Sequence, residues 1–298
     1  MKKDVISMLD LKDDMKKIID EAIMMKEGKY EKIMKDKTMA MIFEKSSTRT
    51  RVSFEVAMEK LGGHAIFLSK NDIQLGRGES VEDTAKVLSR YVDLIMYRAY
   101  SHEKMKELAM HASVPVINGL DDEEHPCQVM ADLMTVKEKK GVLKGLKMVY
   151  FGDGNNNMAH SLILGCAIAG MKIKIVAPRR FWPKEYYIEE AKKLGGEVEV
   201  EEINEKSAEG ADVVVTDTWV SMGDEAEKEE RLRIFKGYTV DGRIMGYAKK
   251  DAIFMHCLPA YYGYEVTKEV AHGEQSVIFD EAENRMWAQM AIIKWLFQ

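Results

Sequence analysis

The amino-acid sequence predicts an α/β fold made of two doubly wound parallel-sheet domains, with a C-terminal helix that returns to the first domain. Three observations support this fold class. Short apolar runs alternate with patterns of helical period, which is typical of βαβ units. The alternation starts a second time after one long helical stretch near the middle of the chain. The chain has 298 residues, enough for two domains of ordinary size.

The first half of the chain opens with a polar amphipathic helix and continues as alternating strands and helices. Residues 48–61 carry apolar side chains at helical spacing and end at two glycines. Residues 80–92 begin with Ser80 and Asp83, the spacing of a helix-starting capping box. The apolar runs between these patterns predict short buried strands at residues 38–43, 64–68, 93–97 and 114–118.

The second half repeats this rhythm after a long helix predicted at about residues 123–140. Strands are expected at residues 147–151, 173–177, 197–201 and 212–216, with helices between the first three. The last segment, 280–297, is a strongly apolar helix that can return to cover the first domain. We therefore expect one domain from residues 1–135 plus 282–298 and a second domain from residues 136–281.

The composition is that of an ordinary globular protein, with 46% hydrophobic residues, 32% charged residues and a mean hydropathy of -0.30. A net charge of -6 gives no basic surface for a phosphate backbone, so we expect no nucleic-acid partner. The three widely spaced cysteines fit a reducing compartment. The charged N-terminus has no apolar signal region and no apolar stretch is long enough to span a membrane, so we expect a cytoplasmic protein with no membrane segment.

The first candidate site lies between the predicted strand 38–43 and the helix after it. The segment 46–51 reads Ser-Ser-Thr-Arg-Thr-Arg, so hydroxyl groups, guanidinium groups and the N–H groups of a helix N-terminus meet at the carboxyl end of a parallel strand. Such donors suit a phosphate group. The plainer alternative is a helix cap beside two solvated arginines, and two arginines within three positions favour phosphate.

The second candidate is the segment His125-Pro126-Cys127-Gln128, at the start of the long central helix. His125 and Gln128 are three residues apart and share one helix face, so an imidazole and a carboxamide point the same way. Proline is well suited to the first turn of a helix. A single histidine is more often a structural residue, and the spacing alone leaves both interpretations open.

The third candidate, residues 152–157, reads Gly-Asp-Gly-Asn-Asn-Asn directly after a predicted strand. It is similar to a dinucleotide-binding turn, but Asn157 stands where a third glycine is expected and no acidic residue ends the next strand. Arg179 and Arg180 leave open the possibility that the turn binds a dinucleotide with a 2′-phosphate. A turn that presents asparagine side chains to a small polar substrate fits equally well, as does a purely structural turn.

Two further candidates follow apolar runs in the second half. Residues 217–223, Asp-Thr-Trp-Val-Ser-Met-Gly, place an acid and a serine at the end of a strand, where they can hold an ammonium group and a carboxylate. Residues 256–259 read His-Cys-Leu-Pro. Adjacent residues of an extended segment face opposite sides, which argues against a Cys-His catalytic pair, and the Leu258-Pro259 bond is a candidate for the cis form. Because no metal-ligand spacing occurs, we expect no metal and no cofactor.

Taken together, the segments FEKSSTRTRVSFE, HPCQ, GDGNN, DTWVSMG and HCLPA closely resemble, in order and spacing, the ornithine carbamoyltransferase family. The likeness runs from about residue 38 to the ENR segment that contains Arg285. It implies that the first domain binds carbamoyl phosphate and the second binds the amine acceptor. The related aspartate carbamoyltransferases share the STRT and HPxQ motifs but lack DxWxSMG and HCLP.

The resemblance implies a role for each of a set of residues. Those implied for carbamoyl phosphate are Ser47, Thr48, Arg49, Thr50, Gln74, Arg98, His125, Gln128, Cys257, Leu258 and Arg285. Those implied for ornithine are Asn156, Asp217, Ser221 and Met222, and the triple asparagine leaves open whether Asn155 or Asn156 faces the amino acid. The implied catalytic residues are Arg98, His125, Gln128, Asp217 and Cys257.

The resemblance also implies the chemistry and the partners. The neutral δ-amine of L-ornithine attacks the carbamoyl carbon, donors from Thr50, Arg98 and His125 hold the oxyanion, and phosphate leaves, giving L-citrulline in arginine metabolism. The chain is expected to form a homotrimer in which the loop 70–80 carries Gln74 into the neighbouring subunit's site. Assembly beyond a trimer and the anabolic or catabolic direction stay open.

Two other classes of protein remain possible at this point. A nicotinamide-dependent oxidoreductase rests on the turn 152–157 and on Arg179 and Arg180. A non-catalytic amino-acid-binding relative would keep residues 217–223 and lose the chemistry, although the arginine, histidine and glutamine residues of the first domain argue against it. Within the enzyme class, putrescine and an acylated ornithine are rival acceptors, and the DTWVSMG segment favours free ornithine.

Overall fold

The structure, a computed structural model, describes residues 2–221, 223 and 225–298. The chain divides into two compact units, one formed by Met1–Met134 with Glu283–Gln298 and the other by Thr135–Ala282. Two helices contribute residues to both units, α5 (Pro126–Lys140) and α11 (Ile278–Leu296). The C-terminal end of the chain thus belongs to the first unit, as the sequence predicts. Across the described residues, no helix has both the length and the apolar character needed to span a bilayer.

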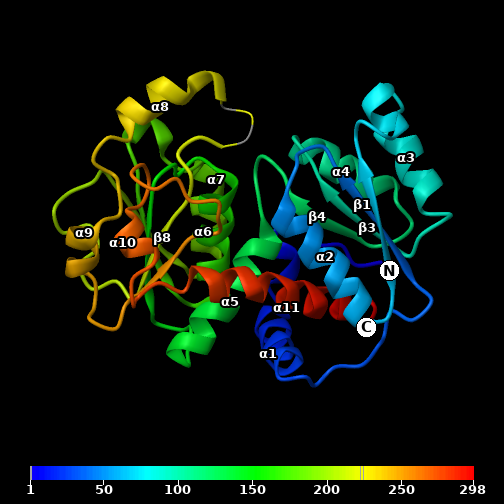
Figure 1. Ribbon diagram of the computed structural model, residues 1–298, viewed down its shortest axis with the longest axis horizontal. Helices are drawn as coiled ribbons and strands as arrows, with labels where there is room; N and C mark the ends of the chain where they lie inside the picture. Colours follow the sequence, from blue (N-terminus) through cyan, green and yellow to red (C-terminus); the bar gives the residue numbers. More distant parts are fainter. Residues whose placement is uncertain (1, 222, 224) are drawn as a thin grey trace. The chain divides into compact units, whose positions relative to one another are not determined.

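The first unit is built on a parallel sheet in the order β2-β1-β3-β4. Figure 1 labels β1, β3 and β4 of this sheet. Its strands are β1 (Thr38–Phe43), β2 (His64–Ser69), β3 (Leu94–Arg98) and β4 (Val116–Leu120). The connecting helices are α2 (Thr48–Lys60), α3 (Val81–Leu88) and α4 (His102–His111), and α1 (Met15–Lys26) precedes the sheet. The strand–helix alternation predicted from the sequence is therefore confirmed.

Helices α3 and α4 pack against one another and cover one face of this sheet. Alternate residues of β1 and β3 point to that face and form a buried core with the helices, which includes Ala40, Ile42, Ile95, Tyr97, Ala85, Met105 and Leu108. The prediction of a buried strand at residues 64–68 is wrong. β2 lies at the edge of the sheet, where only one neighbour covers it, and its side chains are half-buried or exposed.

The second unit is built on a five-stranded parallel sheet in the order β7-β6-β5-β8-β9. Its strands are β5 (Lys147–Phe151), β6 (Lys172–Val176), β7 (Glu197–Glu201), β8 (Val213–Thr216) and β9 (Ile253–Met255). Helices α6 (Asn157–Ala169) and α7 (Glu185–Lys193) pack together, and α8 (Lys228–Ile234), α9 (Gly242–Tyr247) and α10 (Lys268–Ala271) complete the unit. Short 3₁₀ turns occur at Met8–Leu11, Gln74–Arg77, Arg179–Phe181 and Glu225–Glu227.

The N-terminal helix follows a separate turn, and the central helix begins later than the sequence predicts. At the N-terminus, Ser7 and Asp10 form a capping box around a single 3₁₀ turn, so the regular helix starts only at Met15. The central helix starts at Pro126 and not at residue 123, because residues 121–124 fold into a separate turn. Proline has no N–H group, so it fits the first turn of a helix.

Each sheet has one point at which the order of its strands reverses. In the first unit this point lies between β1 and β3, and in the second it lies between β5 and β8. In open parallel sheets, the loops that leave the carboxyl ends of such strands separate and leave room for a ligand. The segment 46–51 follows β1 and Arg98 ends β3, whereas the turn 152–157 follows β5 and Asp217 follows β8. The fold therefore brings most of the candidate segments to the carboxyl ends of the strands at these two points.

The turn after β5 yields a test of packing. A methyl group added at Gly154 would lie 2.7 Å from the Phe181 carbonyl oxygen and 2.8 Å from a methyl carbon of Ile175, so we expect Gly154→Ala to destabilise the protein by about 1–3 kcal/mol. Gly246, inside α9, has open space at the same position, so Gly246→Ala should stabilise by about 0.5–1 kcal/mol. Urea unfolding of both variants measures these changes. Two effects of the same sign would contradict the packing argument.

Candidate active site

The N-terminus of α2 provides an anion-binding feature in the first unit. Ser47 is the cap residue, and its side chain accepts a hydrogen bond of 3.2 Å from the Thr50 N–H group. The first turn of the helix lies just beyond the carboxyl end of β1, with Thr48 exposed and Arg49 half-buried. A helix N-terminus and a guanidinium group both favour a negative charge. The structure thus places the predicted phosphate-binding residues together on one turn.

Two buried arginines meet the hydroxyl group of Thr50. Arg98, at the end of β3, donates to the Thr50 hydroxyl oxygen over 3.4 Å, and Arg285, from α11, donates to the same oxygen over 3.2 Å. These arginines are 6% and 3% exposed. Placing two guanidinium groups at one oxygen is electrostatically costly, because like charges repel strongly where little water screens them. Guanidinium groups in such a position can donate charge-assisted hydrogen bonds to an anion.

His125 and Gln128 lie at the start of α5 and are buried. Gln128 accepts a hydrogen bond of 2.5 Å from Arg285 and donates one of 2.8 Å to Asp132, so its carboxamide has a fixed orientation. Burial lowers the pKa of His125 well below its ordinary value, and the positive charges of Arg285 and Arg98 lower it further. The imidazole is therefore neutral at physiological pH, and it can donate one hydrogen bond without adding charge.

In the second unit, the turn after β5 is shaped by its own side chains. Gly152 has a φ of +131°, a conformation that favours glycine, and Asp153 accepts the Asn155 N–H over 2.9 Å. Asn156 caps α6 by accepting the Ala159 N–H and donates its amide to the Tyr150 hydroxyl over 3.2 Å. Of the two alternatives, Asn155 is exposed and Asn156 is buried. Asn157, which stands where a dinucleotide-binding turn has its third glycine, is the first residue of α6.

Arg231 of α8 links two loops of this unit, and sequence reasoning missed it. Its guanidinium group donates to the Asp153 carboxylate over 2.7 Å and to the Trp219 carbonyl oxygen over 3.2 Å. The turn after β5 and the segment after β8 are therefore tied to the same cation. A sequence of alternating charges, such as that around Arg231, gives no sign that one of them is buried.

Asp217 and Cys257 form the polar centre of the second unit. The Cys257 thiol donates to Asp217 over 3.2 Å, and Asp217 is buried while Cys257 is partly accessible. Burial raises the pKa of the nearby Tyr150 hydroxyl well above its ordinary value, and the charges of Asp217 and Asp153 add to this effect. Tyr150, whose position on β5 gave no functional signal, therefore stays neutral and keeps its proton.

The segment 256–259 is held by His256. This residue accepts the Leu258 N–H at Nδ1 over 2.9 Å, so Nε2 carries the proton that faces Glu265 at 3.2 Å. The Leu258-Pro259 bond is cis, the form for which the sequence made it a candidate. His256 and Cys257 have different partners, as expected for adjacent residues. Their ligand atoms and that of Asp217 nevertheless all lie within 4.8 Å, a grouping that sequence spacing did not predict because Asp217 is distant in the chain.

The remaining predicted residues lie at the surface or outside the described residues. Ser221 is half-buried, and Gln74 is exposed in the 3₁₀ turn that follows β2. Met222 lies outside the described residues. Arg179 and Arg180 are exposed. Arg179 lies over the Trp182 ring at 5.7 Å, and Arg180 pairs with Glu230.

Comparisons with known proteins place both units in one family. A family model described as aspartate/ornithine carbamoyltransferase, carbamoyl-P binding domain, matches residues 3–138. A second model, described as the Asp/Orn binding domain of the same family, matches residues 144–296. The two matches cover nearly the whole chain.

Individual relatives agree with the family models. An ornithine carbamoyltransferase of Picrophilus torridus is 52% identical and the match covers 98% of each chain. A catabolic ornithine carbamoyltransferase of Thermoplasma volcanium is 48% identical, with 98% of this chain and 97% of the relative covered. The crystal structure of the anabolic ornithine carbamoyltransferase of Campylobacter jejuni is 42% identical, with a TM-score of 0.94 and 99% of each chain covered.

The contacts of Arg231 yield a test within the second unit. Arg231→Ala leaves Asp153 buried without its cation, so we expect a loss of about 3–5 kcal/mol in the free energy of unfolding. Arg233→Ala is the matched control on the same helix, and its exposed side chain predicts a change within about 0.5 kcal/mol. Adding Asp153→Asn to Arg231→Ala should recover part of the loss. Urea unfolding of the four variants is the measurement, and equal effects of Arg231→Ala and Arg233→Ala would contradict it.

Proposed function

Because this chain belongs to the aspartate/ornithine carbamoyltransferase family, we propose that it transfers the carbamoyl group of carbamoyl phosphate to the δ-amine of L-ornithine. The products are L-citrulline and phosphate. One observation carries the proposal: each ligand-binding edge of the two sheets holds a different chemistry, donors for an anion in the first unit and an acid with a thiol in the second.

We propose that residues 1–135 and 282–298 bind carbamoyl phosphate. The phosphate group would accept hydrogen bonds from the N–H groups and hydroxyls of residues 47–50 and from the guanidinium group of Arg49. The convergence of Arg98 and Arg285 on Thr50 supports this assignment, because guanidinium groups donate charge-assisted hydrogen bonds to phosphate oxygens. The proposal assigns Gln128 and the Leu258 carbonyl oxygen to the carbamoyl amide nitrogen.

The carbamoyl oxygen is assigned to Thr50, Arg98 and His125. Attack by an amine converts the carbamoyl carbonyl into a tetrahedral oxyanion, and fixed donors stabilise that charge without reorganising. A neutral imidazole is suited to this role, because its N–H group stabilises the oxyanion while no protonated histidine adds to the charges of Arg98 and Arg285. Two arginines, one hydroxyl and one imidazole then share the developing charge.

We propose that residues 136–281 bind ornithine, with Asn156, Asp217, Ser221 and Met222 as its contacts. The Asp217 carboxylate suits the δ-ammonium group, and the Cys257 thiol that donates to Asp217 lies beside it. A free alkylamine has a pKa near that of lysine, about 10.4, so the acceptor must lose a proton before it attacks. We assign the removal of that proton to the carboxylate of Asp217, which Cys257 orients.

The proposed reaction is a direct transfer. The δ-nitrogen forms a bond to the carbamoyl carbon, the bond between that carbon and the phosphate oxygen breaks, and phosphate leaves with the electron pair. The nitrogen gives up one proton as this bond forms, and the departing phosphate takes that proton. The step needs no covalent intermediate on the chain, which agrees with the position of Cys257 as a hydrogen-bond donor to Asp217.

The experiment that tests this function is a citrulline assay with carbamoyl phosphate and a panel of amines. We expect turnover with L-ornithine and weak or no turnover with putrescine, N-acetylornithine and aspartate. Preference for another amine would change the acceptor but keep the class of reaction. No carbamoylation of any amine, or saturable NADP binding that phosphate does not compete with, would overturn the proposal.

The setting of the reaction is proposed from the sequence and its relatives. We propose a cytoplasmic homotrimer that works in arginine metabolism, and we favour arginine biosynthesis. The relatives include proteins named for each metabolic direction, since the Thermoplasma protein is named catabolic and the Campylobacter protein anabolic. Gln74 is assigned to the neighbouring subunit's carbamoyl phosphate, which its exposed position on a polar loop supports.

A pair of substitutions tests the assignment of one substrate to each unit. Arg49→Ala removes a charge-assisted hydrogen bond worth about 1.5–3 kcal/mol, so the KM for carbamoyl phosphate should rise about 10- to 100-fold. Asp217→Asn should abolish most ornithine turnover while calorimetry shows carbamoyl phosphate binding close to that of the unaltered protein. If both substitutions weakened both ligands equally, the division between the units would be wrong.

Mixing of inactive subunits tests the shared site. Gln74→Ala and Arg98→Ala chains should each be poorly active alone, because each lacks one residue of every site. Random reassembly of equal amounts into trimers gives a native pair at one site in four, so about a quarter of the unaltered activity should return. Proven subunit exchange without any recovery would show that Gln74 acts within its own chain.

A further inference from the structure

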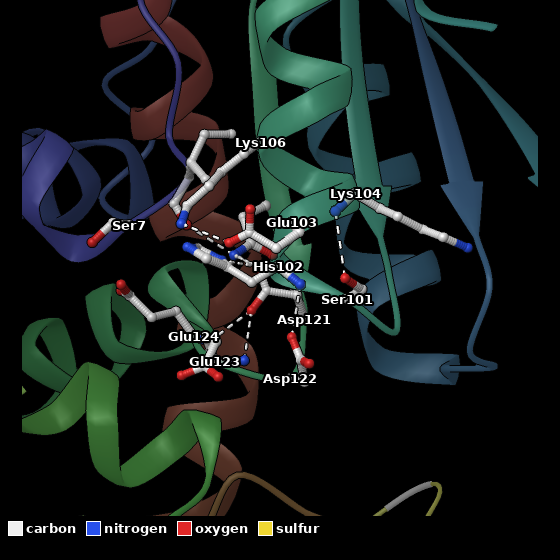
Figure 2. A network of polar contacts seen from close by, with 12 residues as sticks. Ser7, Ser101, His102, Glu103, Lys104, Lys106, Asp121, Asp122, Glu123 and Glu124 are labelled. Atoms are coloured by element: carbon white, nitrogen blue, oxygen red, sulfur yellow. Dashed lines mark hydrogen bonds and ion pairs between the residues drawn. The ribbon is translucent and has the colours of Figure 1, made fainter. Parts of the chain in front are cut away.

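A closed turn of hydrogen bonds precedes His125. The carboxylate of Asp121 accepts the N–H groups of Glu123 and Glu124, both over 2.8 Å, and the Asp121 N–H donates to the Glu124 carbonyl oxygen over 3.0 Å. Both main-chain groups of Glu124 are therefore bound to Asp121. Figure 2 shows Asp121 at the centre of this network, beside the start of α4.

The side chain of Glu124 is anchored from a different part of the chain. It is 2% exposed, and its carboxylate accepts the Met8 N–H over 2.8 Å and lies beside the Ser7 side chain. Burial raises the pKa of Glu124 to about 7, so near neutral pH both the ionised and the protonated forms are populated. The function proposed above does not use this buried acid.

The segment that supplies Ser7 and Met8 is itself fixed. Val5 forms a parallel bridge with Ile117 of β4, and the Asn118 side chain donates to the Ile6 carbonyl oxygen over 2.9 Å. Asn118 also donates to Asp121 over 2.8 Å. Residues 5–8 are thus hydrogen-bonded along β4, and the segment ends at the carboxylate of Glu124.

The opposite side of the turn is held by α4. Nδ1 of the His102 ring lies 2.7 Å from the second carboxylate oxygen of Asp121. The main-chain N–H of His102 donates to the Asp122 carboxylate over 2.7 Å. Burial opposes a charge on His102, but its contact with Asp121 outweighs this and raises the pKa of His102. The charged groups that face the turn are thus His102, Asp121 and Asp122, with Lys106 and Glu103 farther out on α4 (Figure 2).

His125 follows this turn directly. Its carbonyl oxygen accepts the N–H groups of Gln128 and Val129 in the first turn of α5, over 3.1 and 3.3 Å. The residue before it and the peptide after it are both hydrogen-bonded, so the backbone fixes where the imidazole can lie. A displacement of Glu124 is passed to His125 through one peptide bond.

We infer that Glu124 is a positioning residue for His125, which it holds in place by joining the turn 121–124 to residues 7 and 8 of the N-terminal segment. The inference deepens the proposed function and rests on it, since it assigns no new ligand. Glu124 touches no substrate and acts only through the placement of the imidazole. Glu124 can accept the Met8 N–H in either protonation state. The length of its side chain, and not its charge, therefore determines whether it holds the turn in place.

Two conservative substitutions separate reach from charge. Glu124→Gln keeps the length of the side chain and an oxygen for the Met8 N–H, and its amide can donate to the Ser7 hydroxyl. Glu124→Asp keeps the charge but withdraws the carboxylate by one methylene group. Misplacement of a catalytic group can cost up to about 100-fold in rate. We therefore expect kcat to fall about 10- to 100-fold in Glu124→Asp and to stay within about 3-fold in Glu124→Gln, with the KM for ornithine within about 2-fold in both.

Calorimetry measures the binding of carbamoyl phosphate to the first unit and does not require turnover. Glu124→Asp should weaken this binding and Glu124→Gln should not, so the inference can be tested even if the unaltered protein makes no citrulline and the proposed function fails. Glu103→Gln and Glu103→Asp are the matched controls, because Glu103 is exposed on α4 and pairs with Lys106 only at the surface; neither should change kcat. Thermal unfolding checks that each variant is folded.

The outcomes divide cleanly. Full activity of Glu124→Asp, or an equal loss in Glu124→Gln and Glu124→Asp, would overturn the inference, as would a change in the KM for ornithine as large as that in kcat. If Glu124→Asp does not fold, Ser7→Ala takes its place. It removes the side-chain contact with Glu124 and also the cap hydrogen bond that the Ser7 hydroxyl oxygen accepts from the Leu9 N–H, so Asp10→Ala, which removes the other half of the same capping box, is its control. Ser7→Ala should lower kcat about 3-fold with the KM for ornithine unchanged, and an unaltered kcat in Ser7→Ala, or an equal loss in both variants, would count against the inference.

Discussion

The reversal of strand order in each parallel sheet is the constraint on which the rest of this structure depends. At β1 and β3, and again at β5 and β8, consecutive connections leave in opposite directions, and side chains that follow these strands meet at one edge. Residues from distant parts of the sequence, such as Thr50 and Arg98, are brought together in this way. Each sheet creates one such place, and the two places hold different chemistry.

Electrostatics complements this topology in the first unit. Arg98 and Arg285 share one hydroxyl acceptor in a buried position, and their charges add to the effect of burial in lowering the pKa of His125. The unit thus holds its positive charges close together before any ligand is present. In the second unit Arg231 pairs with Asp153. The first arrangement favours an anion, whereas the second unit presents the carboxylate of Asp217, with its thiol partner, where β8 ends.

Sequence reasoning recovered the fold class and the family, because periodicity and short motifs are local properties. The βαβ rhythm, the cap at Ser80, and the segments HPCQ and DTWVSMG can all be read within a few residues. It failed where the determining contact is distant. The exposure of β2 depends on its place in the sheet, and the late start of α5 depends on the contacts of Asp121. The residues assigned from the motifs remain proposals, whereas their geometry is described above.

The missed residues share one physical cause. Arg231 and Glu124 belong to strongly charged stretches, and a charged residue in such a stretch is usually solvated. Each is buried only because a partner from another part of the chain, Asp153 for Arg231 and Met8 for Glu124, satisfies it. The partners lie 78 and 116 positions away, so no local pattern reveals them.

The first unit is discontinuous, and this has a consequence for the order in which the protein matures. Synthesis proceeds from the N-terminus, so the four strands of the first sheet emerge well before Glu283–Gln298, which complete the unit and supply Arg285. The second unit is contiguous in the chain and can fold while the last segment is still being made. A nascent chain therefore lacks the second guanidinium group at Thr50 until residues 283–298 have been made and have joined the first unit.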